Sequence, residues 1–331
     1  MSLAEKAATD VDDLAEQRRY WIDKLAGGPR PAGPRPDHRR PEHRSERSAA
    51  AAFEIDGETF DRLEKLTSGE PFLEYAALAA ALTACLYRHT QASPIVIGCP
   101  AMKSETEPAD PGTLVPIVND VDGQMSFRQL LLGVRQTLLD AHARQHYPYS
   151  RLLDDLALPA APNRCPLFDV SLAYGAVHHE MPEAGNDVAL NLRREPGRMR
   201  GTAMFSPELY ETATIERFSQ HLVCLLSAGL ENSRAALAEL DMLAAEERRQ
   251  LLVGWNDTAH EYPRELCVHE LFEAQAARAP GSVALVDGDR RLTYQELNDR
   301  ANQLAHRLQK LGVGANTPAG VCMNRSAELV V

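Results

Sequence analysis

The chain has 331 residues, of which 44% are hydrophobic, and it carries a formal net charge of -12. This length predicts two domains, and the acidic balance argues against a nucleic-acid partner, which needs clustered lysine and arginine. No apolar run reaches the ~20 residues that span a bilayer, and the N-terminus lacks the layout of a signal peptide, so we expect a cytoplasmic protein without a membrane partner. The six scattered cysteines form no Cys-x-x-Cys pair, which argues against a zinc motif or a disulfide framework.

The first third of the chain predicts a helix, an extended basic segment and then alternating strands and helices. Apolar residues fall on one face of a helix over residues 10–26, which Gly27-Gly28-Pro29 ends. Prolines interrupt the arginine-rich segment 30–47, so we expect an extended linker there and not an RNA-binding surface. Beyond it, the apolar spacing predicts a strand, a long helix and a short buried strand at residues 51–55, 72–88 and 95–98.

The middle of the chain continues this alternation. Ser126 and Gln129 have the spacing of a capping box, and they predict the start of a helix. Alternation of apolar and other residues over 168–174 predicts a half-buried strand, with Asp169 on its solvent face. A second long helix is predicted over residues 214–230. Strands separated by helices of this length predict an α/β layer fold.

The last part of the chain predicts a separate small α/β piece. An amphipathic helix begins at Val268, and Asp287-Gly288-Asp289 predicts the turn of a hairpin. Thr293 and Glu296 have capping-box spacing, so they predict the start of another long helix. We expect a further strand from residue 320. Because a piece of about 70 residues is near the size at which one core becomes marginal, we expect it to be less stable than the part before it.

Short motifs in a fixed order resemble the condensation domain of nonribosomal peptide synthetases. The series starts with Arg19-Tyr-Trp-Ile-Asp-Lys-Leu-Ala-Gly and continues with motifs that begin at Val96, Leu114, Ser126, Gln145, Asn163, Phe205 and Ile215. Each motif is weak alone, but their order makes the match specific. The sequence after them resembles the entry to an adenylation domain, because it contains Trp255-Asn-Asp-Thr, Val268-His-Glu-Leu-Phe, Ala279-Pro-Gly-Ser-Val and Leu292-Thr-Tyr-Gln-Glu-Leu.

The resemblance implies an α/β fold in two parts. The first is a chloramphenicol-acetyltransferase-like half-lobe with a mixed sheet and helices, and the second is the truncated start of an adenylation (AMP-binding) domain. We expect a leader, the second lobe of a condensation domain with a proline and arginine linker inside it (29–47), a further linker, and the incomplete adenylation piece, over residues 1–14, 15–252, 253–262 and 263–331.

Catalysis in this family is associated with a His-His-x-x-x-Asp-Gly motif in the first lobe. Here the pair His178-His179 is followed by Glu183 and Ala184 at the positions of the Asp and the Gly. The pair follows a second-lobe strand and lies in a stretch rich in Pro, Gly, Asn and Asp. We therefore expect an exposed loop and no catalytic role.

The motif that begins at Leu114 supplies the candidates for an interface between the lobes. These are Asn119 and Asp120, the latter at a position where the family usually has Thr. No metal or cofactor site is expected in this chain, because the other histidines share no predicted face and are expected at surface or core positions: His142, His146, His221, His260, His269 and His306.

The resemblance also implies cofactors and partners. Phosphopantetheine would be carried by partner carrier proteins, and ATP would bind only to a complete adenylation domain. The implied partners are peptidyl or aminoacyl carrier protein domains and a separate first condensation lobe.

Two functional classes remain open. The first is a part of a synthetase module that makes a peptide secondary metabolite, such as an antibiotic, by joining carrier-tethered aminoacyl groups. Because the His-His-x-x-x-Asp-Gly motif is missing, we expect the 331 residues alone to be inactive. The second is a non-catalytic docking platform for a carrier protein or an adenylation domain. A standalone acyltransferase of the acetyltransferase superfamily is disfavoured, since it would need the histidine motif too.

Overall fold

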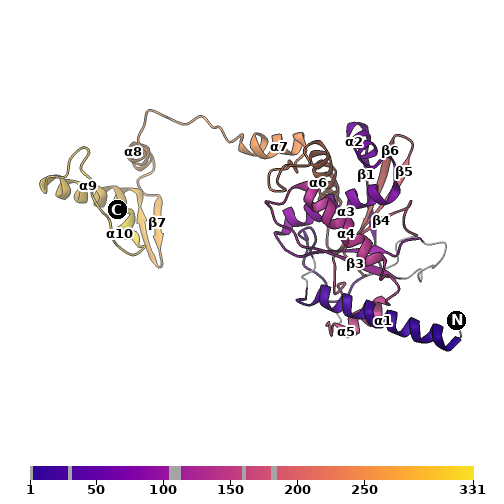
Figure 1. Cartoon of the computed structure of the whole chain (residues 1–331). Coiled ribbons are helices and arrows are strands. Elements are labelled where there is room, and N and C mark those ends of the chain that lie inside the picture. The colour runs from indigo at the N-terminus through magenta and orange to yellow at the C-terminus, as the bar shows by residue number, and fades with distance from the viewer. Residues whose placement is uncertain (1–2, 29–31, 104–112, 159–161, 180–184) are drawn as a thin grey trace. The chain divides into compact units, whose positions relative to one another are not determined.

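The chain divides into two compact units, one up to Trp255 and one from Asn256 to Val331. The structure, a computed structural model, describes residues 3–28, 32–103, 113–158, 162–179 and 185–331 (Figure 1). The first unit contains a six-stranded sheet and most of the helices, whereas the second contains a two-stranded hairpin and three helices in its residues, all of which the structure describes. None of the helices in these described ranges is both long and apolar enough to cross a membrane.

The sheet of the first unit is mixed, with the strand order β1-β6-β5-β4-β2-β3. The pairs β2–β4 and β4–β5 are parallel, and the other neighbours are antiparallel. The strand bounds are β1 Ala49–Ile55, β2 Ile95–Pro100, β3 Leu114–Asn119, β4 Val170–Tyr174, β5 Val188–Glu195 and β6 Arg198–Phe205.

Helices α2, α3, α4 and α6 pack against the sheet and one another, and α1 packs with α5 at the other end of the unit (Figure 1). Residues of these helices, of the strands and of the segments between them together form the large hydrophobic core. The helix bounds in this unit are α1 Leu3–Leu25, α2 Gly57–Thr67, α3 Pro71–Thr90, α4 Phe127–His142, α5 Tyr149–Asp155, α6 Thr212–Glu231 and α7 Ala245–Leu252.

Helix α3 is the centre of this core. The side chain of Glu70, just before the helix, accepts hydrogen bonds from the first backbone N–H groups, and Pro71 at the first helical position has the φ angle that a helix needs. The sequence pattern predicts one buried face, but every residue from 74 to 86 is buried. Alanines make this possible, because their small side chains let α4 and α6 approach the helix closely.

Strand β4 is buried on both faces, so the expectation of a half-buried strand is wrong. All of its residues, Val170–Tyr174, are buried. The reason is its place in the sheet between β2 and β5, where covered faces leave no solvent side. Asp169, expected on a solvent face, is 4% exposed and is held by a bidentate ion pair with Arg164.

The proline and arginine segment, residues 32–48, is extended but fixed along the fold. The Asp37 carboxylate accepts hydrogen bonds from the N–H of Glu211 at 2.9 Å and from the hydroxyl of Thr214 at 3.0 Å, so it caps α6 from a distant part of the chain. Arg40 forms an ion pair with the buried Asp187. The segment therefore differs from a free linker.

The second unit is small and has little interior. It contains strands β7 Val283–Asp287 and β8 Arg290–Thr293, and helices α8 Val268–Arg278, α9 Tyr294–Lys310 and α10 Ala327–Val330. The 3-10 helix Gly254–Asn256 spans the boundary between the two units. Its buried cluster consists of Leu292, Leu297 and Ala327. The strand expected from residue 320 is wrong, because those residues pair with no strand in the described part of the unit and Val321 is 71% exposed.

Candidate functional site

Asn119 and Asp120 lie at the end of β3, which is an edge strand of the sheet. The backbone of Asn119 pairs with Ile95, and its side chain is buried, whereas Asp120 is exposed. Within the described ranges, the Nδ2 atom of Asn119 has no hydrogen-bond partner. A buried polar group without a partner costs about 1–3 kcal/mol. The Nδ2 atom is itself enclosed, so Asp120 is the polar side chain that this end of β3 presents at the surface.

The two histidines of the His178-His179 pair face in different directions. His178 is 1% exposed and its Nδ1 accepts a hydrogen bond from the backbone N–H of Tyr174 at 3.1 Å, while His179 is exposed. The expectation of an exposed loop is therefore wrong for His178. A tight turn after β4 returns the chain to the sheet, where His178 forms a bridge with Met102. Glu183 lies outside the described residues.

The buried surroundings of His178 keep its ring neutral. Burial, together with the nearby His142 and Lys103, lowers the pKa of His178 to about 3. Burial also lowers the pKa of His142 to about 4. The ring of Tyr75 packs edge-on against His178, with 4.4 Å between the ring centroids. These contacts make His178 a core residue, and they give it no free carboxylate partner among the described side chains.

A second histidine cluster joins three helices, and the sequence pattern did not reveal it. The His221 ring on α6 contacts Glu247 on α7 through Nε2 at 2.8 Å and His89 on α3 through Nδ1 at 3.1 Å. His221 is 7% exposed. Its helical spacing in α6 gave a signal for an inward position, but nothing local connects it with residues on two other helices.

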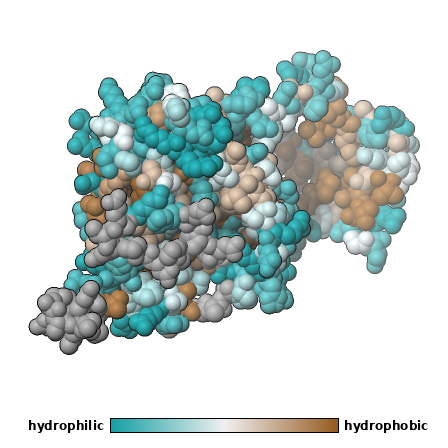
Figure 2. Space-filling model, turned by 90° about the vertical axis from the view of Figure 1, so that its right-hand side faces the viewer, coloured by the Kyte–Doolittle hydropathy of each residue, from teal (hydrophilic) through white to brown (hydrophobic). Residues whose placement is uncertain are grey.

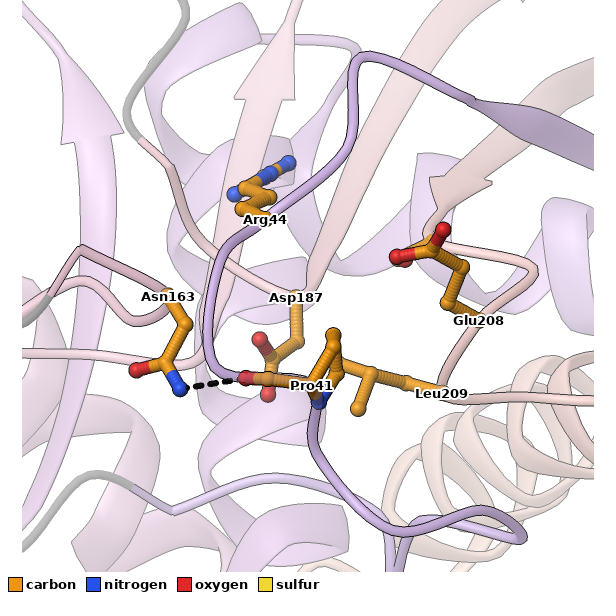
Figure 3. A pocket seen from close by; sticks show the side chains of 7 residues that line it. Pro41, Arg44, Asn163, Asp187, Glu208 and Leu209 are labelled. Atoms are coloured by element: carbon orange, nitrogen blue, oxygen red, sulfur yellow. Dashed lines mark hydrogen bonds between the residues drawn. The ribbon is translucent and has the colours of Figure 1, made fainter.

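A small pocket lies where the proline and arginine segment crosses the ends of β5 and β6 (Figure 3). The amide of Asn163 points at the carbonyl of Pro41 and donates a hydrogen bond to it at 2.6 Å. Asp187 is engaged by Arg40, and Arg44 donates to the carbonyl of Asn186 at 2.8 Å. These polar groups are already paired with one another, so the pocket is a contact that holds the proline and arginine segment against the fold and is not a binding site.

The second unit contributes a capped helix but, in its described residues, no cluster of side chains that could catalyse a reaction or bind a metal ion. Thr293 and Glu296 form the predicted capping box at the start of α9, with Thr293 Oγ1 accepting from the Glu296 N–H at 3.2 Å. These two side chains stabilise the start of the helix, because each accepts a hydrogen bond from the backbone N–H of the other residue. Among the described residues, no group of three or more His, Cys, Asp or Glu side chains could hold a metal ion.

The arrangement of the sheet and its helices is the fold of condensation domains from nonribosomal peptide synthesis. The X-domain in its complex with OxyB from teicoplanin biosynthesis has a TM-score of 0.61 and 22% identity, with coverage of 70% of this chain and 56% of that chain. A four-domain nonribosomal peptide synthetase bound to AMP and glycine has a TM-score of 0.73 and 16% identity, covering 92% of this chain and 26% of that chain.

The sequence places the chain in the same family. The condensation-domain family matches residues 3–252, and the AMP-binding enzyme family matches residues 272–331. The chain belongs to the condensation-domain family, and the start of an AMP-binding domain follows. The predicted α/β fold and the resemblance to peptide synthetases are thereby confirmed.

The curated relatives are very large synthetases. Tyrocidine synthase 2 of Brevibacillus parabrevis is 32% identical over an alignment of 348 residues that covers 99% of this chain and 10% of that protein. Bacitracin synthase 1 of Bacillus licheniformis is 30% identical over an alignment of 347 residues that covers 99% of this chain and 7% of that protein. The chain therefore spans a small part of the length of the relatives it matches.

Proposed function

We propose that this chain is part of a nonribosomal peptide synthetase module that joins aminoacyl groups tethered to carrier proteins. The observation that carries the proposal is the order of the two matches, with a condensation domain directly before the start of an AMP-binding domain. Relatives named as tyrocidine and bacitracin synthases, at 30% identity or more, support a peptide antibiotic or similar metabolite as the product class. They favour a synthetase over a separate docking platform.

The proposed chemistry assigns the cofactors to other parts of the module. Phosphopantetheine on carrier proteins would bring the two substrates as thioesters, and the protein would act mainly by holding them in reacting positions. ATP would be used by a complete adenylation domain. We propose a cytoplasmic location for the module, since its adenylation domain would draw on ATP.

Within this function, residues 15–252 would form the second lobe of the condensation domain, and residues 263–331 would open the adenylation domain. We propose that Asn119 and Asp120 lie where a first lobe binds. The exposed Asp120 and the edge position of β3 support this, because an edge strand presents backbone groups to which another chain can bind.

The test measures dipeptide formation by mass spectrometry, with donor and acceptor carrier proteins loaded as aminoacyl thioesters. We expect no product from the 331 residues alone, because they lack the His-His-x-x-x-Asp-Gly motif. We expect product when a first lobe with the His-His-x-x-x-Asp-Gly motif is added as a separate polypeptide. Substitution of the exposed Asp120, Asp120→Ala, should lower that product, and Asn302→Ala at an exposed position of α9 should leave it unchanged.

Two results would contradict the proposal. One is product from the chain alone that is lost on His179→Ala, since this would make the second-lobe pair catalytic. The other is failure of every added first lobe while the chain binds the acceptor carrier protein, which would favour the docking platform. A companion assay, ATP–pyrophosphate exchange with a panel of amino acids, should give no exchange above a heat-killed control.

A further inference from the structure

Helix α7, residues Ala245–Leu252, is the last helix of the first unit, and it is held weakly. None of its residues is buried, and its start has no side-chain cap. A helix of this length is marginal in water without outside support, because helix nucleation is costly. Just beyond it, Val253 is 60% exposed and Trp255 is 66% exposed, so these side chains add little anchorage.

The charged pairs of α7 differ in what they join. Arg249 pairs with Glu246 inside the helix, and Arg248 pairs with Asp241 just before it. Glu247 instead reaches His221 on α6, with 2.8 Å between Oε2 and Nε2. Among the ion pairs of the described residues, it is the one that joins α7 to another helix.

The ring of His221 is oriented so that it can donate a hydrogen bond to Glu247. A carboxylate can only accept hydrogen bonds, so Nε2 of His221 carries the hydrogen that Glu247 receives. The other ring nitrogen is engaged by Nε2 of His89 at 3.1 Å, which fixes the orientation of the ring. His89 in turn packs edge-on against the buried Phe218, with 5.5 Å between the ring centroids. Both nitrogens of His221 are thus used, and its ring is anchored in the core.

We propose that Glu247 and His221, with His89 behind them, form a clasp that holds α7 on the first unit and sets the length of free chain ahead of α8, the first α-helix of the second unit. With the clasp closed, the chain without helix or strand before α8 is residues 257–267. With the clasp open, α7 frays and the free chain begins after Met242, which packs against the core. The reach of a connection grows with its number of free residues. The inference does not depend on the proposed activity.

The experiment measures hydrogen exchange of residues 245–255 in the full chain by mass spectrometry. Glu247→Ala should speed exchange there about tenfold, the effect expected from losing a hydrogen bond to a charged group. Glu246→Ala is the matched control, because it removes a neighbouring carboxylate from the same turn and leaves α6 untouched. Both substitutions introduce the strongest helix former, so a loss of intrinsic helix propensity cannot explain faster exchange.

Two further measurements make the result decisive. The double variant Glu247→Ala, His221→Ala should exchange no faster in residues 245–255 than Glu247→Ala, because the clasp is already open. Small-angle X-ray scattering should give a larger radius of gyration for Glu247→Ala than for Glu246→Ala. Equal exchange in the two single variants would overturn the clasp. Faster exchange with an unchanged radius of gyration would overturn its control of the connection.

Discussion

Helices α4 and α9 start in the same way and end in different surroundings. Ser126 and Gln129 form a reciprocal capping box at α4, and Thr293 and Glu296 form one at α9. Yet α4 buries five residues, Phe127, Leu130, Val134, Leu138 and Ala141, whereas α9 buries Leu297 alone. The comparison teaches that local hydrogen bonds decide where a helix begins, and that the rest of the fold decides whether its apolar face is covered.

The same contrast extends to the two units. In the first unit, helices and sheet share one large core, but the buried cluster of the second unit has only a few members. Figure 2 shows brown hydrophobic side chains on the outer surface of the second unit, in the fainter part of the picture. Exposed apolar residues there include Val268, Leu304, Leu311 and Val321. We therefore expect the first unit to carry most of the stability.

The largest expected loss of stability comes from breaking the buried charge network of the first unit. Glu74 on α3 is 0% exposed and is held by Arg194 and by the hydroxyl of Tyr174. Arg194→Met would leave a buried carboxylate without its cation, and such a loss costs about 3–5 kcal/mol of unfolding free energy. Urea denaturation followed by circular dichroism measures it.

The control for this prediction is Arg200→Met. Arg200 pairs with Glu54 at 3.2 Å on the surface of β6, with 43% of its side chain exposed. A surface pair of this kind contributes under about 1 kcal/mol. Similar small losses from both variants would show that Glu74 does not depend on Arg194.

The second effect tests close packing at β2, the strand beside the edge strand β3. A Cβ atom at Gly98 would lie 2.2 Å from Cε2 of Phe168, so Gly98→Ala forces β2 and its neighbours apart. Overpacking of this kind costs about 1–3 kcal/mol. Gly133→Ala in α4 is the opposite case, because its Cβ meets no atom within 4 Å, and it should raise stability by about 0.5–1 kcal/mol. A stable Gly98→Ala protein with an unchanged urea midpoint would contradict the packing described here.

The third effect is a loss of stability in acid that comes from the first unit. The pKa of His178 is lowered to about 3 and that of His142 to about 4, so both rings stay neutral in the fold while the unfolded chain takes up protons. Stability therefore falls as the pH drops below about 6.5 and continues to fall until the folded pKa is reached. Between pH 7 and pH 5, each ring should cost on the order of 1–2 kcal/mol.

Substitution of one histidine isolates its share of this acid sensitivity. His178→Asn keeps an acceptor near the N–H of Tyr174 and removes the titrating ring, so it should flatten the dependence of the urea midpoint on pH. His179→Asn changes the exposed neighbour and should leave the dependence as it is. A steeper or identical dependence in His178→Asn would show that this ring is not the source.

The smallest effect compares the two helix caps directly. Loss of an N-cap hydroxyl costs about 1 kcal/mol. Ser126→Ala should lower the unfolding free energy of the whole first unit by this amount, because α4 belongs to its core. Thr293→Ala should instead speed exchange in the first turns of α9 and leave the first unit unchanged. Equal effects of both variants on one common unfolding transition would contradict the separation of the units.

Features that depend on neighbouring residues could be predicted from the sequence. Both capping boxes and the turn at Gly288 of the β7–β8 hairpin are confirmed, because each is set by groups a few residues apart. The long helices α3 and α6 follow from apolar spacing. Helix and strand patterns alone predict only a general α/β architecture. The family motifs were needed to predict which α/β fold the chain has.

Features that depend on distant partners could not be predicted. His178 is buried because the chain after β4 bridges back to Met102, and strand spacing carries no sign of that return. The burial of β4 follows from its position in the strand order. Helix α2 was missed, although Phe60 and Leu63 give it a buried face. The strand expected from residue 320 had the right composition, but a strand also needs a partner for its backbone hydrogen bonds.

Hydrogen exchange of the unmodified chain tests the central claim most directly, since it measures the two capped helices in one sample. The account predicts strong protection of residues 127–142 in α4, close to the global stability of the first unit, and weak protection of residues 294–310 in α9. Equal protection of both helices in a monodisperse monomer would contradict the account, because it would show that the second unit is as stable as the condensation-domain core.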